Sequence, residues 1–264
     1  MKIIGNFIKG ILIGAGCILP GISSGVLCVI FGIYDKLLDS ILNFFKDIKK
    51  NFKFLFPIAT GGVIGIIIFS RALEYLLEKF PMQTKSIFIG LILGGVALLF
   101  KQILSKEKWE KSNLIYIIIS MIIGIVMVYL ENTLQIGSIE NANYLYLILS
   151  GFLMSIGIVV PGVSSTIILM LLGIYSLYLT SISNLYLPVL IPIAIGVLVG
   201  SLIFMKIIKI LLDKYNRQTM FSIIGFTLGS IFVLLPDIQN VMEIIISISC
   251  IFIGFCIMRQ LGQS

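Results

Sequence analysis

Long apolar runs separated by short polar segments make up this sequence of 264 residues. Hydrophobic residues account for 59% of it and charged residues for only 12%. The longest run without Lys, Arg, Asp or Glu extends from Asn141 to Met205, which is enough for up to three crossings of a bilayer core at roughly 20 residues per helix. The pattern therefore predicts an integral membrane protein built from helices.

The apolar pattern occurs twice along the chain. PGISSGVLCVIFGIY, which begins at Pro20, matches PGVSSTIILMLLGIY, which begins at Pro161, and a second block from Pro57 matches the block from Pro192. We name residues 1–130 the first half and residues 141–264 the second half, and we expect both to form one transport domain. Each half has a segment interrupted by Pro-Gly and then three spans: 6–41 with spans at about 54–77, 87–104 and 114–130, and 144–182 with spans at about 188–208, 221–235 and 241–258.

The arms of the interrupted segments are too short to cross a bilayer. Ile11–Leu19 and Val26–Tyr34 are each about 13 Å long as helices, half of a bilayer core. One interpretation is a re-entrant hairpin with its tip near the midplane, and the other is a single kinked spanning helix. The hairpin is favoured because it places nearly all lysine-rich loops on one face, the cytoplasmic one. The exceptions are Arg71, Lys79 and Lys85.

A hairpin plus three spans crosses the membrane an odd number of times, so the second half is inverted relative to the first. We therefore expect an all-α polytopic membrane protein with two inverted-topology repeats, each a Pro-Gly-tipped re-entrant helical hairpin plus three transmembrane helices. The N- and C-termini then lie on the lysine-rich, cytoplasmic face. Inverted repeats are typical of transporters in which one central site opens alternately to either side.

The two Pro-Gly tips, PGISSG at Pro20 and PGVSST at Pro161, suit an anion. Serine favours the first position of a helix, where free N–H groups attract a phosphate or carboxylate. Non-helical backbone at midplane depth is tolerated only where it is buried or lines a cavity. The alternative is that Pro-Gly merely kinks a packed helix while the serines bond back to carbonyls.

A charged stripe stands at the end of the first ordinary span in each half. Arg71, Glu74 and Glu78 share a helical face, and Lys206, Lys209 and Asp213 repeat the spacing. Arg71 and Lys206 are candidates for neutralising a bound phosphate, and Glu74 for coupling proton movement. The alternative is that these side chains reach to lipid headgroups. Tyr34 and Tyr175, which end the GIY motifs, are candidate cavity residues, although a role as interfacial anchors is by itself sufficient to explain them.

Several function classes are excluded or disfavoured by composition. The chain has no histidine, so the commonest general base and metal ligand is missing. We expect no catalytic residues, no metal, no cofactor and no enzymatic activity. The net charge of +7 comes from lysines beside apolar spans, where membrane topology explains them better than nucleic-acid binding. No GxxxxGK[ST] motif for ATP is present, and the sequence does not indicate an oligomeric state.

The two PG-x-S motifs, the GIY motifs and the GLILGG and GFTLGS blocks resemble the PopT family of bacterial polyprenyl-phosphate translocases. The resemblance covers nearly the whole chain. It implies a flippase in the bacterial cytoplasmic membrane that moves undecaprenyl phosphate from the outer to the inner leaflet to recycle the carrier lipid of cell-wall synthesis. By the same resemblance, the phosphate site is lined by Gly21, Ser23, Ser24, Gly25, Gly162, Ser164, Ser165 and Thr166.

This sequence departs from the family pattern at small residues. The family motifs read approximately PGxSGGT and PGxSGS, whereas Ser24 and Ser165 stand here in place of the glycine after the serine, and Thr166 in place of the closing serine. From the residues alone, a secondary transporter or channel for a small soluble anion remains the alternative. A membrane enzyme acting on lipid phosphates is a further alternative that predicts clustered acidic residues or a metal site, and the sequence shows neither. A scaffold would leave the duplicated tips without a purpose.

Overall fold

The computed structural model describes residues 2–18, 24–105, 109–133, 139, 142–163, 165–184 and 186–261. All regular structure in these ranges is helical. The first half contains α1 (Lys2–Ile18), α2 (Ser24–Ile30), α3 (Tyr34–Leu42), the 3₁₀ turn η1 (Phe44–Lys46), α4 (Ile48–Lys79), α5 (Pro81–Leu104) and α6 (Ser112–Thr133). The second half contains α7 (Tyr144–Val159), α8 (Ser165–Leu171), α9 (Tyr175–Ser183), α10 (Leu187–Lys214), α11 (Asn216–Ser230), the 3₁₀ turn η2 (Ile231–Leu234) and α12 (Val241–Leu261).

Five helices of the described chain are long and apolar enough to cross a membrane: α4 over Ile48–Phe69, α5, α6, α10 and α12. Large hydrophobic side chains are exposed along them, as at Ile67, Ile119 and Phe252. Such surfaces are stable only against lipid. The protein is therefore a multi-pass membrane protein, as the apolar pattern predicted.

The predicted span 221–235 does not form one membrane-length helix. α11 ends at Ser230 after 15 residues, which corresponds to about 22 Å, and continues only as the turn η2. Leu235 is extended, with φ −56° and ψ 122°, because a residue that precedes a proline, here Pro236, disfavours helical backbone.

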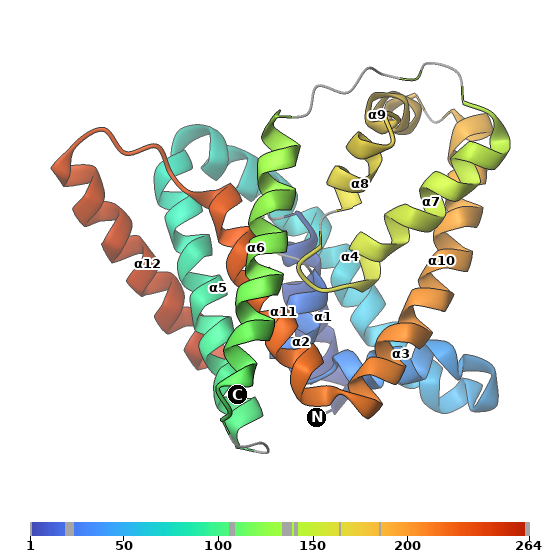
Figure 1. The fold of residues 1–264 in the computed structure, drawn as a ribbon, viewed down its shortest axis with the longest axis horizontal. Coiled ribbons are helices and arrows are strands. Elements are labelled where there is room, and N and C mark those ends of the chain that lie inside the picture. Colours follow the sequence, from blue (N-terminus) through green and yellow to red (C-terminus); the bar gives the residue numbers. More distant parts are fainter. Residues whose placement is uncertain are drawn as a thin grey trace.

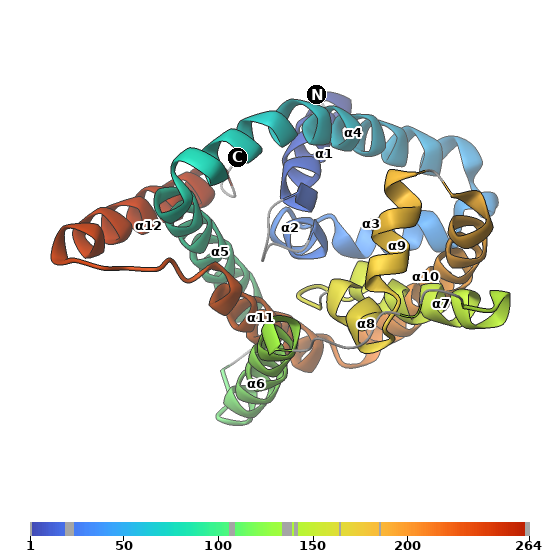
Figure 2. The ribbon, with the colours of Figure 1, turned by 90° about the horizontal axis from the view of Figure 1, so that it is seen from above.

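The long helices pack in four pairs. α1 packs along α4 and α7 along α10, whereas α5 packs along α12 and α6 along α11 (Figure 1). Figure 2 shows the α1–α4 and α7–α10 pairs on different sides of the molecule. The first two pairs each join helices of one half, and the other two each join a helix of one half to a helix of the other.

Glycines let the backbones of each pair approach closely. A Cβ atom placed on Gly10 would overlap the carbonyl of Ile58 in α4, and one on Gly151 would overlap the carbonyl of Ile193 in α10. The same holds between α5 and α12 at Gly90, and between α11 and α6 at Gly225. These four positions exclude any larger side chain without separation of the helices.

The second arm of each interrupted segment ends earlier than predicted. α2 stops at Ile30 and α8 at Leu171. Gly32 follows with φ +64° and Gly173 with φ +68°, a left-handed conformation that glycine adopts without steric cost. The Ile33 N–H donates a hydrogen bond to the Cys28 carbonyl over 2.9 Å, which closes the end of α2. Tyr34 therefore begins a new helix, α3, instead of ending the arm.

The short helices α3 and α9 lie at opposite edges of the molecule. Figure 1 shows α3 at the edge where both chain ends lie, and α9 at the other edge. α7 and α8 extend from the α9 edge toward the middle, where the segment that joins them turns. α2 is buried along Gly25–Ile30 and contributes to the main hydrophobic core with α5 and α11. α4 begins at Ile48, before the predicted span of about 54–77, because Asp47 caps it by accepting a hydrogen bond from the Lys50 N–H over 3.1 Å.

Candidate functional site

The first Pro-Gly tip is described only from Ser24 onward. Gly21 and Ser23 lie outside the described residues. Ser24 is half-buried at the first position of α2, and Gly25 is buried. These two predicted site residues therefore lie where a buried helix begins.

The second tip has a fixed, non-helical backbone. α7 ends at Val159, and the Val163 N–H bonds to the Val160 carbonyl over 3.2 Å to close a turn. Gly162 in this turn has φ +87°, and a Cβ atom there would lie 2.6 Å from the Cβ of Phe226 in α11. Glycine is thus required both by conformation and by close packing on α11.

The remaining residues of the second tip lead into α8. Ser165 is half-buried at the start of that helix. The backbone of Thr166 lies in α8, but its side chain and all of Ser164 are outside the described residues. A Cβ atom on Gly157 would overlap the backbone N of Ser165, so α7 and α8 are in close contact behind the tip.

Tyr34 joins α3 to the second tip. Its hydroxyl donates a hydrogen bond to the Val159 carbonyl over 2.6 Å, and the residue is only 5% exposed. The Val159 carbonyl is one of the acceptors left unpaired where a helix ends. Tyr34 is therefore not an interfacial anchor: it holds the last turn of α7 from the other half of the chain.

Tyr175, the matching tyrosine of the second half, has a different environment. It is half-buried and packs at the edge of the smaller hydrophobic cluster. Its hydroxyl donates to none of the described acceptors. The identical GIY motifs gave no sign of this difference between Tyr34 and Tyr175.

The charged stripe of the first half is described only in part. Arg71 and Glu74 lie in α4, and nothing is described of their side chains. Glu78 contacts Lys79 over 3.8 Å with both side chains mostly exposed, an arrangement that contributes little to stability.

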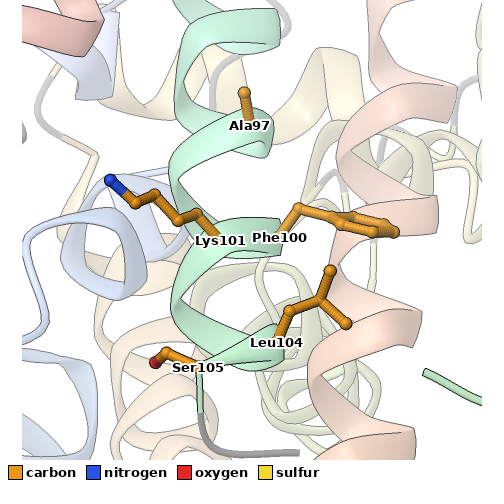
Figure 3. A pocket seen from close by; sticks show the side chains of 5 residues that line it. All are labelled: Ala97, Phe100, Lys101, Leu104 and Ser105. Atoms are coloured by element: carbon orange, nitrogen blue, oxygen red, sulfur yellow. The ribbon is translucent and has the colours of Figure 1, made fainter. Parts of the chain in front are cut away.

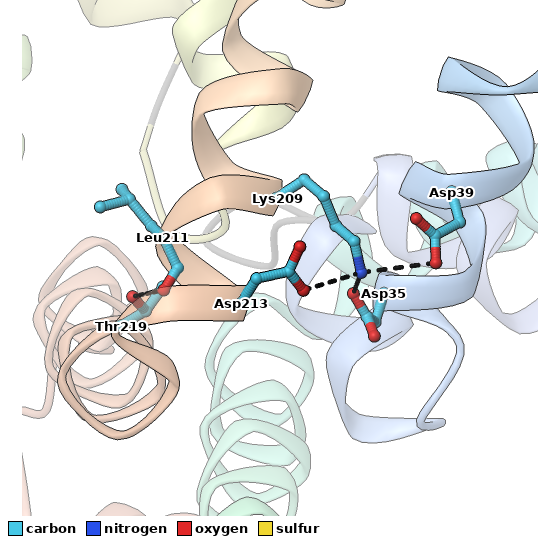
Figure 4. Close-up of polar contacts among 6 residues, drawn as sticks. All are labelled: Asp35, Asp39, Lys209, Leu211, Asp213 and Thr219. Atoms are coloured by element: carbon cyan, nitrogen blue, oxygen red, sulfur yellow. Dashed lines mark hydrogen bonds and ion pairs between the residues drawn. The ribbon is translucent and has the colours of Figure 1, made fainter.

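In the second half, Lys209 links the charged stripe of α10 to α3, and Lys206 does not. The Lys209 Nζ lies 2.5 Å from Asp35 and 3.4 Å from Asp39 of α3, and 3.2 Å from Asp213 of its own helix. Figure 4 shows the ammonium between these carboxylates. Lys206 is exposed on α10 and forms no ion pair with the described residues. The sequence contained one signal for this contact: Asp35 and Asp39 are one helical turn apart and so place two carboxylates on the same face.

The charges around Lys206 and Lys209 determine which of these two lysines can attract an anion. Three carboxylates surround the one ammonium of Lys209, so the cluster has a net negative charge and repels a phosphate. Lys206, on the same face of α10, has no such carboxylate partner among the described residues. Lys206 therefore stays a candidate phosphate ligand and Lys209 does not.

A surface depression of about 710 Å³ lies on α5, away from these residues. Figure 3 shows Phe100 and Leu104 pointing to one side of the helix and Lys101 to the other. The depression contains none of the predicted site residues. It is lined by Ala97, Phe100, Lys101, Leu104 and Ser105. The described part of the chain also contains no group of three His, Cys, Asp or Glu residues fit to hold a metal ion.

Comparison with known proteins accounts for nearly the whole sequence. Residues 13–251 match the family described as VCA0040-like, undecaprenyl phosphate translocase-like. The polyprenyl-phosphate transporter of Vibrio cholerae is 28% identical over 245 residues, which cover 88% of this chain and 77% of that protein. The polyprenyl-phosphate transporter of Staphylococcus aureus is 29% identical over 270 residues, which cover 98% and 95%. No solved structure matches the chain. The resemblance drawn from the motifs is confirmed, and the chain belongs to the undecaprenyl phosphate translocase-like family.

Proposed function

We propose that this protein is a transporter, not an enzyme, and that it moves undecaprenyl phosphate from the outer to the inner leaflet of the bacterial cytoplasmic membrane. The family match includes both Pro-Gly tips, and two relatives are named polyprenyl-phosphate transporters. The observation that carries the proposal is the turn at Gly162, with φ +87°. Non-helical backbone inside a membrane protein persists only where it is buried or lines a cavity.

The two halves act as inverted repeats. Support comes from their helix pairing, since α1–α4 corresponds to α7–α10, and α5–α12 to α11–α6. The glycines of these interfaces also correspond in sequence, as with Gly61 and Gly196, whose Cβ atoms would overlap the carbonyls of Phe7 and Ile148. The opposite placement of α3 and α9 agrees with the inversion. Both termini are then cytoplasmic, and each hairpin enters from its own side.

The lipid phosphate binds between the tips and is reached alternately from either leaflet. The ligands are N–H and hydroxyl groups of Ser24, Gly25 and Ser165, together with Gly21, Ser23, Gly162, Ser164 and Thr166. Arg71 and Lys206 supply positive charge near the phosphate. Glu74 couples transport to an ion gradient.

The test is leaflet exchange of a labelled polyprenyl phosphate in liposomes that contain the purified protein. The Ser23→Ala/Ser164→Ala variant should lose most of the exchange. Ser249→Ala is the matched control, because Ser249 is exposed on α12 and, within the described residues, its hydroxyl bonds only to the Ile245 carbonyl of its own helix. Absence of exchange with the unmodified protein overturns the lipid proposal, and uptake of labelled inorganic phosphate instead establishes the small-anion alternative.

A further inference from the structure

Two consecutive residues of α3 bind the second half of the chain. The hydroxyl of Tyr34 bonds to Val159 of α7, and the carboxylate of Asp35 bonds to Lys209 of α10. Asp39, one turn later, also reaches the Lys209 ammonium. α3 thus packs on α10 through a cluster of charges and is attached to the end of α7 through a buried hydroxyl.

The corresponding place in the other half lacks this attachment. The alignment puts Ser176 and Thr180 of α9 where α3 has Asp35 and Asp39, and Glu74 of α4 where α10 has Lys209. No cation occupies any of these aligned positions. Within the described chain, α9 and α4 also share no packing comparable to that of α3 and α10. The halves therefore differ in this one contact while their helix pairing is the same.

We infer that Tyr34, Asp35 and Lys209 are positioning residues that hold α3 on α7 and α10 and so keep the transport path closed at the α3 edge in the resting protein. The inference rests on the proposed alternating access. Because α9 has the uncharged Ser176 and Thr180 in place of Asp35 and Asp39, the two closed conformations differ in free energy, and the unloaded protein favours the one closed at the edge that contains both termini. Charge pattern makes that edge cytoplasmic, so the unloaded site faces the outer leaflet, where its proposed substrate starts.

The test measures the position of α3 directly. Spin labels attached at Lys36→Cys on α3 and Lys214→Cys on α10, both exposed in the structure, report the distance between the helices in the full-length protein in lipid nanodiscs without substrate. The native cysteines are replaced. Lys209→Met leaves three carboxylates facing one another, and we expect a roughly fivefold increase in the ratio of long to short distances, the upper end of what an exposed ion pair supplies.

Asp213→Asn is the matched control. Asp213 also pairs with Lys209 but belongs to the same helix, so its removal should leave the distances unchanged. The charge exchange Asp35→Lys/Lys209→Asp keeps one cation among three carboxylates and should restore the short distance. Tyr34→Phe should lengthen the distances and Tyr175→Phe should not. Unchanged distances in both Lys209→Met and Tyr34→Phe, with normal thermal stability, overturn the inference.

Failure of this inference is distinguishable from failure of the proposed function. The distance measurement requires no transport, whereas the leaflet-exchange assay requires no labels. Lipid exchange by the unmodified protein, with unchanged distances in both Lys209→Met and Tyr34→Phe, contradicts only the attachment of α3. A distance shift in a protein that exchanges no lipid supports the attachment and overturns the transport proposal.

Discussion

The Lys9 ammonium in α1 donates a hydrogen bond to the Phe31 carbonyl, just beyond α2, over 3.1 Å. At the matching place of the second half, the Tyr146 hydroxyl in α7 donates to the Leu172 carbonyl over 2.7 Å. Both acceptors are among the carbonyls that a helix end leaves unpaired. Each first arm therefore holds the end of the second arm, with a different donor in each half.

Removing either donor should destabilise its arm. Lys9→Met and Tyr146→Phe each leave a partly buried carbonyl unpaired, which costs about 1–3 kcal/mol. The loss should be larger for Lys9, because hydrogen bonds from charged donors are stronger. Thermal unfolding in detergent measures both, with Lys101→Met on exposed α5 surface as control. An unchanged melting temperature for Lys9→Met would show that water replaces the ammonium at no cost.

The turn at Gly162 should not tolerate alanine. Gly162→Ala places a Cβ atom against Phe226 on a backbone with φ +87°, and we expect a loss of about 1–3 kcal/mol. Gly5→Ala is the control, because nothing lies within 4 Å of a Cβ atom there and alanine favours a helix by roughly 0.5–1 kcal/mol over glycine. The two variants should change the unfolding free energy in opposite directions, and a shared direction would contradict the geometry of the tip.

Adjacent glycines of α4 should respond differently to the same substitution. A Cβ atom on Gly61 would overlap the Phe7 carbonyl, whereas one on Gly62 has only the Gly10 carbonyl, at 3.8 Å, nearby. Gly61→Ala should therefore separate α1 from α4 and cost about 1–3 kcal/mol, and Gly62→Ala should cost little. Unfolding of both variants in the same detergent decides it: equal losses would refute the close approach.

The pair of Glu110 and Arg217 should make stability depend on pH. The guanidinium donates to the Glu110 carboxylate over 2.5 Å, and this hydrogen bond lowers the pKa of Glu110 below its ordinary value of 4.5. The stabilisation is complete above the unfolded-state pKa and disappears as the pH falls through the lower folded-state pKa. Glu110→Gln should therefore unfold more easily than the parent near neutral pH, and the two melting curves should converge in acid. A difference that persists in strong acid would rule out ionisation as its cause.

The predictable part of the fold came from residues whose effect is local. Gly32 and Gly173 end the arms because glycine alone enters left-handed backbone without strain. The duplicated GIY motif marked the region where both arms end, but the second arm was predicted to continue to the tyrosine. The predicted end of α11 was wrong because the apolar run continues through Ile231–Leu235, and only Pro236 indicated that the helix ends earlier.

The partners in long-range contacts could not be predicted from the sequence, although the spacing of Asp35 and Asp39 placed two carboxylates on one face of a helix. Lys209 and Asp35 are far apart in the chain, and the alignment of the halves placed Lys209 against Glu74, so it indicated no partner on α3. Tyr34 and Tyr175 occupy the same motif, and their difference depends on which carbonyl the fold brings within reach. The predicted tip residues Ser24, Gly25, Gly162 and Ser165 lie where helices begin or turn, and their role toward a phosphate stays a prediction.

Two helix pairs, α5–α12 and α6–α11, join a helix of the first half to a helix of the second, and this pairing affects how the chain assembles during synthesis. α4 follows α1 within the first half, so both helices of that pair are synthesised early. The surface of α5 at Gly90 and Gly94 packs against Phe255 and Met258 of α12, which is the last helix described and is synthesised much later. Until then lipid covers a surface shaped for another backbone. The halves therefore cannot mature as separate modules, and a chain interrupted before α12 would leave α5 without its partner even though the whole first half has been made.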